Sequence, residues 1–174
     1  DPLLAIRPAT ALVIALFLAG AWDDALAESE SILGACDDTG TGVGRLTART
    51  LTGLIAHYRC NDEAAEDALE QALGITGVTD GYSVPFLLQL QALRMERAGA
   101  IEAASSLMAD TAALAASLAP AIRPWFALDA VRLAVTKGDV STALVDGLVE
   151  QAAPLGRPGP LGMARIASGV ARGD

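Results

Sequence analysis

The amino-acid sequence predicts an all-α chain built from helix-turn-helix repeats of about 39 residues. A turn motif centred on glycine recurs at a nearly constant spacing, and prolines stand about one helix length before these turns. No segment shows the sustained alternation of apolar and polar residues that is typical of a β-strand. A fixed period of this length in a helical chain is the signature of a repeat architecture.

The turn motif consists of an anchor residue followed, five residues later, by an alanine. The anchors are Gly20, Cys60, Gly99 and Gly138, and each stands about 39 positions after the one before. The alanines are Ala25, Ala65, Ala104 and Ala143. Glycine takes the left-handed conformation that ends a helix, and Asn61 beside Cys60 tolerates it as well. Each motif therefore predicts a tight turn between two helices, and a fifth anchor stands at Gly173.

Prolines predict where the first helix of each repeat begins. Pro8, Pro85, Pro124 and Pro160 stand at similar distances before the anchor glycines at 20, 99, 138 and 173. Proline fits the first turn of a helix, where its missing N–H has no partner to lose. We expect the alanine one turn into each second helix to allow close packing. The predicted repeats cover residues 8–38, 44–77, 83–118 and 121–154, and a single trailing helix covers 160–172.

One helical hairpin cannot bury its apolar face alone, so we expect the four hairpins to stack as one αα-hairpin solenoid domain over residues 1–174. The core should be aliphatic and alanine-rich, because 52 % of the residues are apolar and only 4 % are aromatic. The first helix, over residues 9–19, is apolar on nearly every side and needs cover all round. Either end-on packing or a preceding repeat would provide it. The start at Asp1 favours a fragment of a larger protein.

The segments 17–33, 58–73 and 97–107 resemble tetratricopeptide-type (TPR) repeats. The period is longer than is usual for such repeats, and it is similar to that of the superhelical repeat domain of ATP-dependent LuxR-family transcription regulators of the maltose-activator type. This resemblance covers nearly the whole chain. It implies a cytoplasmic domain of a bacterial transcriptional regulator that senses a protein partner or a small-molecule inducer on the concave face of its helical array.

In that family a nucleotide-binding module precedes the repeat domain, and a DNA-binding helix-turn-helix module follows it. This chain carries neither a P-loop nor a recognisable DNA-binding helix-turn-helix, so the resemblance assigns it neither activity. The alternative hypothesis is a TPR-like protein-protein interaction scaffold unrelated to transcription. The sequence identifies neither the ligand nor the oligomeric state, and it leaves an oligomer open.

Charge and composition exclude several classes of partner. A net charge of −9 argues against contact with nucleic acid, which needs clustered lysine and arginine. The apolar run from Ala9 to Trp22 is too short to span a bilayer and lacks the basic start of a signal peptide. Cys36 and Cys60 are expected to be unpaired thiols in a reducing cytoplasm. A single lysine beside eleven arginines, with abundant alanine and glycine, indicates a bacterial genome rich in GC.

No residue pattern indicates catalysis, a cofactor or a metal site. The loop 40–44 has three glycines but lacks the Lys-Ser/Thr ending of a phosphate-binding loop, and we interpret it as a flexible connection between repeats. His57 is the only histidine, and its register matches the apolar Phe17, which favours packing. Five acidic residues on one second helix suit a solvated face, with a surface for a cation or a basic partner as the alternative. They are Asp62, Glu63, Glu66, Asp67 and Glu70.

Polar residues on the first helices are the candidate binding site. First helices usually line the concave surface of helical-repeat proteins, where partners bind. The candidates are Arg49, Thr52, Gln91, Arg94, Trp125 and Asp129. This mixture suits a small polar ligand or a peptide, while the alternative is a set of ordinary exposed polar residues around a packed Trp125.

Overall fold

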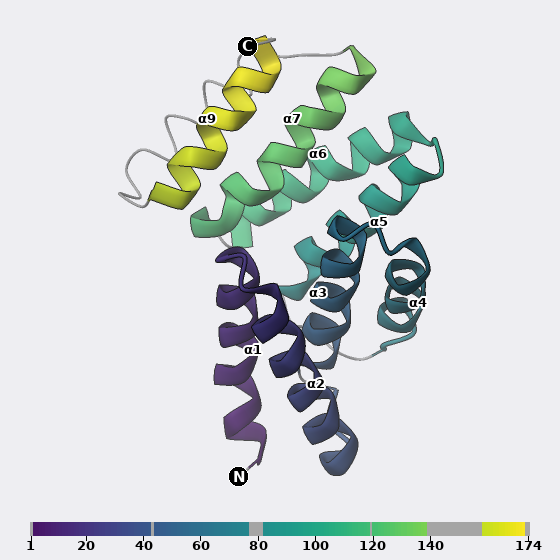
Figure 1. Ribbon diagram of the computed structural model, residues 1–174, viewed down its shortest axis with the longest axis vertical. Helices are drawn as coiled ribbons and strands as arrows, with labels where there is room; N and C mark the ends of the chain where they lie inside the picture. Colours follow the sequence, from purple (N-terminus) through teal and green to yellow (C-terminus); the bar gives the residue numbers. More distant parts are fainter. Residues whose placement is uncertain (1, 43, 77–81, 119, 139–157, 173–174) are drawn as a thin grey trace. The chain divides into compact units, whose positions relative to one another are not determined.

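The computed structural model describes residues 2–42, 44–76, 82–118, 120–138 and 158–172 (Figure 1). Every regular element in these ranges is a helix, which confirms the predicted all-α class. The chain divides into two compact units, Asp1–Leu90 and Gln91–Asp174, and the boundary lies inside α5 (Ser83–Arg97). The helices pack in adjacent pairs within these units.

The first unit holds the two predicted hairpins of the N-terminal half. The first hairpin consists of α1 (Pro2–Leu18) and α2 (Trp22–Thr39), and the second consists of α3 (Arg45–Tyr58) and α4 (Asp62–Leu73). The two helices of each hairpin pack on each other, and α3 also packs on α2 and contacts α1. The N-terminal half of α5 completes this unit.

The second unit contains the C-terminal half of α5, then α6 (Ile101–Leu118), a short 3-10 helix (Pro120–Ile122) and α7 (Arg123–Lys137). The trailing helix predicted over 160–172 is present as α9 (Pro158–Arg172). Helix α7 packs on both α6 and α9. The expected second helix of the fourth repeat, with Ala143, and the fifth anchor Gly173 lie outside the described residues.

Each of the four predicted turns contains a residue with the left-handed backbone conformation. At the second turn this residue is Cys60 itself, whereas Asn61, which was expected to tolerate the conformation, has a φ of −94°. The φ angles of Gly20, Cys60, Gly99 and Gly138 are 79°, 58°, 81° and 80°. At the first three anchors the anchor N–H donates to the carbonyl three residues back, and the next N–H donates to the carbonyl five residues before it, at 2.9–3.0 Å. This is the Schellman pattern, which satisfies carbonyl groups at the end of a helix. The four predicted turns are therefore present in the backbone, and Cys60 is the described residue other than glycine that takes a positive φ.

The alanines that follow the anchors are buried as predicted. Ala25, Ala65 and Ala104 are each 0 % exposed. Each alanine N–H donates to the carbonyl of the residue after its anchor, at 2.9, 3.1 and 3.0 Å respectively. The alanine therefore belongs to the first turn of the second helix, where a larger side chain would meet the packed interior.

The core is mainly aliphatic, as expected, but its largest side chains are aromatic. Phe17 and Phe86 in the first unit and Phe126 in the second are all 0 % exposed. They are the three phenylalanines of the sequence. Every phenylalanine of this aromatic-poor chain is therefore used in the core.

Two expected helix boundaries are wrong. Helix α1 begins at Pro2, so Pro8 lies inside it instead of near its start. Pro8 is exposed, where the loss of one N–H donor is best tolerated. Helix α2 continues to Thr39, one residue beyond the end predicted for the first repeat at residue 38. The other three prolines do lie in the first turns of α5, α7 and α9.

Gly44 is more constrained than a flexible connection would be. Its φ is 84°, and a Cβ built on it would lie 2.9 Å from atoms of Ile6 and Thr10 and 3.0 Å from Ile32. Such distances are too short for a real Cβ. Glycine is therefore required at this point by both the backbone conformation and the close approach of α3 to α1 and α2.

Candidate functional site

The six candidate residues lie on first helices, divided between the two units. Arg49 and Thr52 lie on α3 in the first unit, and both are half-buried. They belong to the side of α3 that is not fully covered, together with Arg45 and Ala56, at the spacing of one helical stripe. The structure therefore brings these two candidates onto one accessible face.

The other four candidates lie in the second unit, two on α5 and two on α7. Gln91 and Arg94 lie on α5 and Trp125 lies on α7, all half-buried. Asp129, also on α7, is buried at 9 % exposure. Its carboxylate accepts a hydrogen bond from Arg132, one turn along the same helix, at 3.1 Å.

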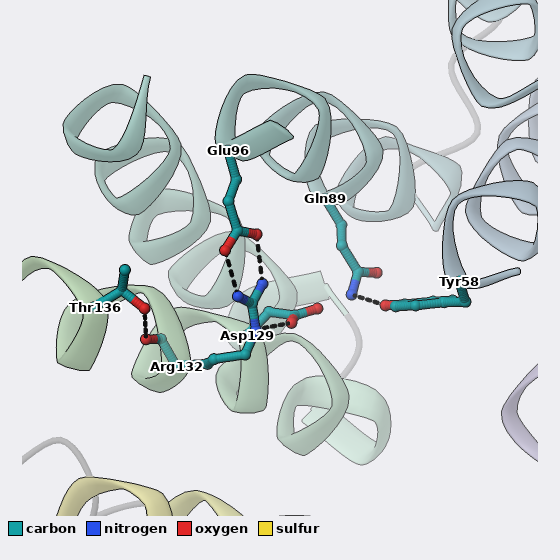
Figure 2. A network of polar contacts seen from close by, with 6 residues as sticks. All are labelled: Tyr58, Gln89, Glu96, Asp129, Arg132 and Thr136. Carbon is teal, nitrogen blue, oxygen red and sulfur yellow. Dashed lines mark hydrogen bonds and ion pairs between the residues drawn. The ribbon is translucent and has the colours of Figure 1, made fainter. Parts of the chain in front are cut away.

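Arg132, which is not among the six residues predicted from the sequence, is the centre of a polar network (Figure 2). Its two terminal nitrogens donate to the two carboxylate oxygens of Glu96 on α5, at 2.5 and 2.7 Å, while its Nε donates to Asp129. Such a two-pronged arginine–carboxylate pair fixes orientation as well as distance. The network joins the C-terminal half of α5 to α7 within the second unit.

The electrostatics of this network keep Arg132 charged. The hydrogen bonds that Arg132 donates to Glu96 raise the pKa of Arg132 most, burial opposes them, and the charge of Asp129 adds to the increase. The side chains of Arg132, Glu96 and Asp129 are 38 %, 22 % and 12 % exposed. Because the network is only partly buried, we interpret it as a structural clamp with modest net stabilisation.

An aromatic cluster tightens the first unit. Tyr58 stacks on Trp22 with ring centroids 5.8 Å apart and on Phe17 at 6.5 Å. Phe17 meets Phe86 edge-on at 5.9 Å. The side-chain amide of Gln89 donates to the Tyr58 hydroxyl at 3.2 Å, as Figure 2 also shows. The cluster therefore links α1, α2 and α3 to the start of α5, and we interpret it as structural.

Residues around the cluster explain two features of the sequence. The ring of His57 meets that of Tyr58 edge-on at 5.7 Å, in agreement with the packing role predicted for this histidine. The guanidinium of Arg59 donates a hydrogen bond to the carboxylate of Asp23 at 2.8 Å. The same guanidinium lies over the Trp22 ring, 5.9 Å from its centroid. Asp23, three residues after the anchor Gly20, therefore forms an ion pair with an arginine of the second hairpin.

The remaining surface features in the described part of the chain are an acidic helix and two cysteines. The five acidic side chains on α4 are all exposed, as a solvated face requires. Among the described residues, no group of three or more His, Cys, Asp or Glu is placed to hold a metal ion. No described helix has the length and apolarity needed to cross a membrane. Cys36 is buried, Cys60 is exposed, and neither forms a disulfide.

The partners of the clamp carry a sequence signal that a search by register could have found. Glu96 and Arg132 are 36 residues apart, and so are Thr47 on α3 and Ser83 on α5, whose hydroxyls hydrogen-bond. Each pair joins the first helices of two successive predicted repeats. The separation of 36 residues is about one helical turn shorter than the predicted period of about 39. A search of the sequence for opposite charges or hydroxyl pairs 36 residues apart could therefore have found these contacts.

Comparisons of the chain with protein-family models, with curated proteins and with solved structures give no match.

Proposed function

We propose that this chain is a helical-repeat domain that binds a partner through the accessible sides of its first helices and catalyses no reaction itself. The observation that carries the proposal is the equal 36-residue separation of Thr47–Ser83 and Glu96–Arg132. It supports an arrangement in which first helices of adjacent repeats lie side by side in each unit. Repeats arranged in this way offer an extended surface for binding.

The residues that we propose to contact a partner are the half-buried polar side chains of these helices. In the first unit they are Arg49 and Thr52, and in the second they are Gln91, Arg94 and Trp125. Arginine and tryptophan are enriched among the residues that dominate binding energy. Asp129 fits a less direct role, because its carboxylate already accepts a hydrogen bond from Arg132.

The narrower proposal is that the domain senses a ligand or partner for a LuxR-family transcription regulator. Its support is the long repeat period and the resemblance of the turn segments. A general interaction scaffold is the alternative, and the tight repeated turns suit both. The coding sequence on either side of this segment discriminates between them. A Walker motif upstream with a helix-turn-helix downstream would favour the regulator, and neither would be expected for a general scaffold.

A site-specific crosslinking experiment tests the binding proposal. A photo-crosslinking amino acid is placed at Thr52 or Gln91 in the full-length protein, and at Glu66 or Glu70 on the exposed face of α4 as a matched control. We expect crosslinks to a common partner from the first-helix positions, with little from α4. A partner captured only from Glu66 and Glu70 would assign binding to the acidic face and contradict the proposal.

Ligands too small to crosslink need a second measurement. A ligand that binds only the folded state raises the melting temperature according to its concentration and affinity. A thermal-shift screen of small polar metabolites against the chain, repeated with Arg94→Ala, covers this case. We expect a ligand of the proposed site to lose most of its shift in the variant.

A further inference from the structure

Charge in the described helices is divided between the first and the second helices of the hairpins. The second helices α2, α4 and α6 contain no lysine or arginine, and they carry most of the acidic residues of the chain. The first helices α1 and α3 of the N-terminal unit contain no aspartate or glutamate. In the other unit, α5 and α7 contain one acid each, Glu96 and Asp129, and both carboxylates accept hydrogen bonds from Arg132. The first helices are therefore basic in a chain whose net charge is −9.

The helix dipole does not explain this division of charge. The dipole favours acidic residues at the start of a helix and basic residues at its end. Asp37 and Asp38 nevertheless stand at the end of α2, and Arg45 is the first residue of α3. A different interaction must therefore favour arginine on the first helices.

Ion pairs within the first unit explain Arg45 and Arg59. Arg45 pairs with Asp37 and Arg59 pairs with Asp23, both at 2.8 Å. Arg49 lies between these arginines in the sequence and is half-buried on α3. Its guanidinium forms no ion pair or hydrogen bond with another residue in the described ranges. It is therefore a cation partly removed from water without a carboxylate to compensate it.

The second unit contains a similar arginine. Arg123 is the first residue of α7 and is half-buried. Its Nε is buried and has no hydrogen-bond partner in the part of the chain that the structure describes. A buried donor without a partner costs free energy. An arginine with unused hydrogen-bonding capacity therefore stands on a first helix in each unit.

We infer that the partner contacts α3 through an acidic segment of its chain, and that a carboxylate of this segment pairs with Arg49. The inference rests on the proposed function and names the kind of partner that the same site binds. Charge complementarity is the argument for this occupant, because every charged residue of α3 is basic and one of them has no described partner. A carboxylate can accept two parallel hydrogen bonds from a guanidinium, which fixes orientation as well as distance.

The shape of the accessible stripe of α3 favours a peptide segment over a small anion. The stripe consists of Arg45, Arg49, Thr52 and Ala56, all half-buried. At 1.5 Å per residue it extends over about 16 Å. The acidic helices α2 and α4 both pack on α3 and would repel the phosphates of a long nucleic-acid strand. A short segment with a carboxylate opposite Arg49 avoids most of this repulsion.

The test begins with a photo-crosslinking amino acid at Thr52, about one helical turn from Arg49, in the full-length protein in its own cells. We expect the captured segment to be rich in aspartate and glutamate. A synthetic peptide of that segment is then titrated against the purified chain. Arg49→Gln should weaken peptide binding at least tenfold. Arg165→Gln removes the same charge from an exposed position of α9 and is the matched control, with a change of less than twofold.

A double-mutant cycle separates the ion pair from a general effect of Arg49→Gln on the fold. Each acidic residue of the peptide is replaced in turn by its amide. One replacement should weaken binding to the parent chain at least tenfold and leave binding to the Arg49→Gln chain unchanged, because that pair is already broken there. Melting temperatures of the two chain variants are measured alongside.

Several results would overturn the inference while the proposed function stands. They are a captured segment without acidic residues, crosslinks only to nucleic acid or to another copy of the chain, a change of less than twofold with Arg49→Gln, and a cycle in which no peptide carboxylate couples to Arg49. The absence of any crosslink from both Thr52 and Gln91 would contradict the proposed function itself, and the inference with it.

Discussion

At the scale of single residues, Arg132 links two helices of the second unit through its ion pairs. It holds two carboxylates from two helices, Glu96 on α5 and Asp129 on α7. Asp129 is the most buried of the three, so it depends most on the cation beside it. Asp129 was predicted as a binding residue on its position alone, and its neighbour Arg132 indicates a role in holding the helices together.

We expect Arg132→Ala to lower the free energy of unfolding by about 1–2 kcal/mol, because two partly buried carboxylates lose their cation. The expected loss of stability is small because the Arg132 side chain is 38 % exposed and solvent screens its charge. Urea unfolding followed by circular dichroism measures it. Arg165→Ala, at an exposed position of α9, is the control and should change stability by less than about 0.5 kcal/mol. Equal stability of the two variants would argue against the clamp.

The two cysteines should react very differently. Burial raises the pKa of the Cys36 thiol, so less of it is the reactive thiolate at neutral pH, whereas Cys60 is exposed. A colorimetric thiol assay on the folded chain should therefore show one fast thiol, with the second reacting only after denaturation. Cys60→Gly should remove the fast phase. Two fast thiols in the folded chain would show that Cys36 is accessible after all.

At the scale of the element, the αL residue at the end of each first helix sets the turn. Cys60 takes φ 58° where the other anchors are glycines. Non-glycine residues pay a conformational cost in this region. We expect Cys60→Gly to stabilise the chain by about 0.5–1 kcal/mol, with the gain reduced by the greater entropy of glycine in the unfolded state.

Gly99→Ala is the reverse change and should destabilise by about 1 kcal/mol. A Cβ at Gly99 would meet nothing within 4 Å, so its effect reports backbone conformation without a steric clash. Thermal or urea unfolding measures the change in stability of Cys60→Gly and of Gly99→Ala. Opposite signs are expected, and the same sign for both would contradict the role assigned to the turns.

Close packing of the two helices in a hairpin should make the motif alanines sensitive to size. Ala65→Leu and Ala104→Leu should each cost about 1–3 kcal/mol, because both sites are 0 % exposed and have no room for three more carbons. Ala103→Leu, at the exposed neighbouring position, is the matched control and should be nearly neutral. Denaturant unfolding of the three variants measures these changes in stability. Neutral results at 65 and 104 would mean that the hairpins pack loosely.

At the scale of the whole molecule, the proposed function predicts that the first helices, and not the acidic α4, contact the partner. Once crosslinking has identified the partner, we expect Arg94→Ala or Trp125→Ala to weaken its binding by about 1–2 kcal/mol or more in calorimetric titrations. Glu66→Ala and Glu70→Ala should change affinity little, beyond a salt-dependent effect on association rate. Trp125 is half-buried, so the melting temperature of its variant is measured alongside. Loss of affinity only in the glutamate variants would place binding on α4.

The backbone could be predicted from the sequence because its signals are local. A glycine that takes positive φ, the bonds to carbonyls three and five residues back, and an alanine one turn later all lie close together along the chain. Cys60 shows how strong this context is, since the turn forms there without glycine. Pro8 marks the limit, because an exposed helix position tolerates a proline that sequence patterns assign to a helix start.

The sequence by itself determined the all-α class, the four turns and the placement of polar candidates on first helices. Only the tertiary structure decided that Arg132 joins Glu96 to Asp129 and that Gly44 is tightly enclosed. The physical reason is range. Turns depend on hydrogen bonds between near neighbours. Side-chain partners 36 residues apart depend instead on how two packed helices are shifted along each other, and a shift of one turn exchanges every partner.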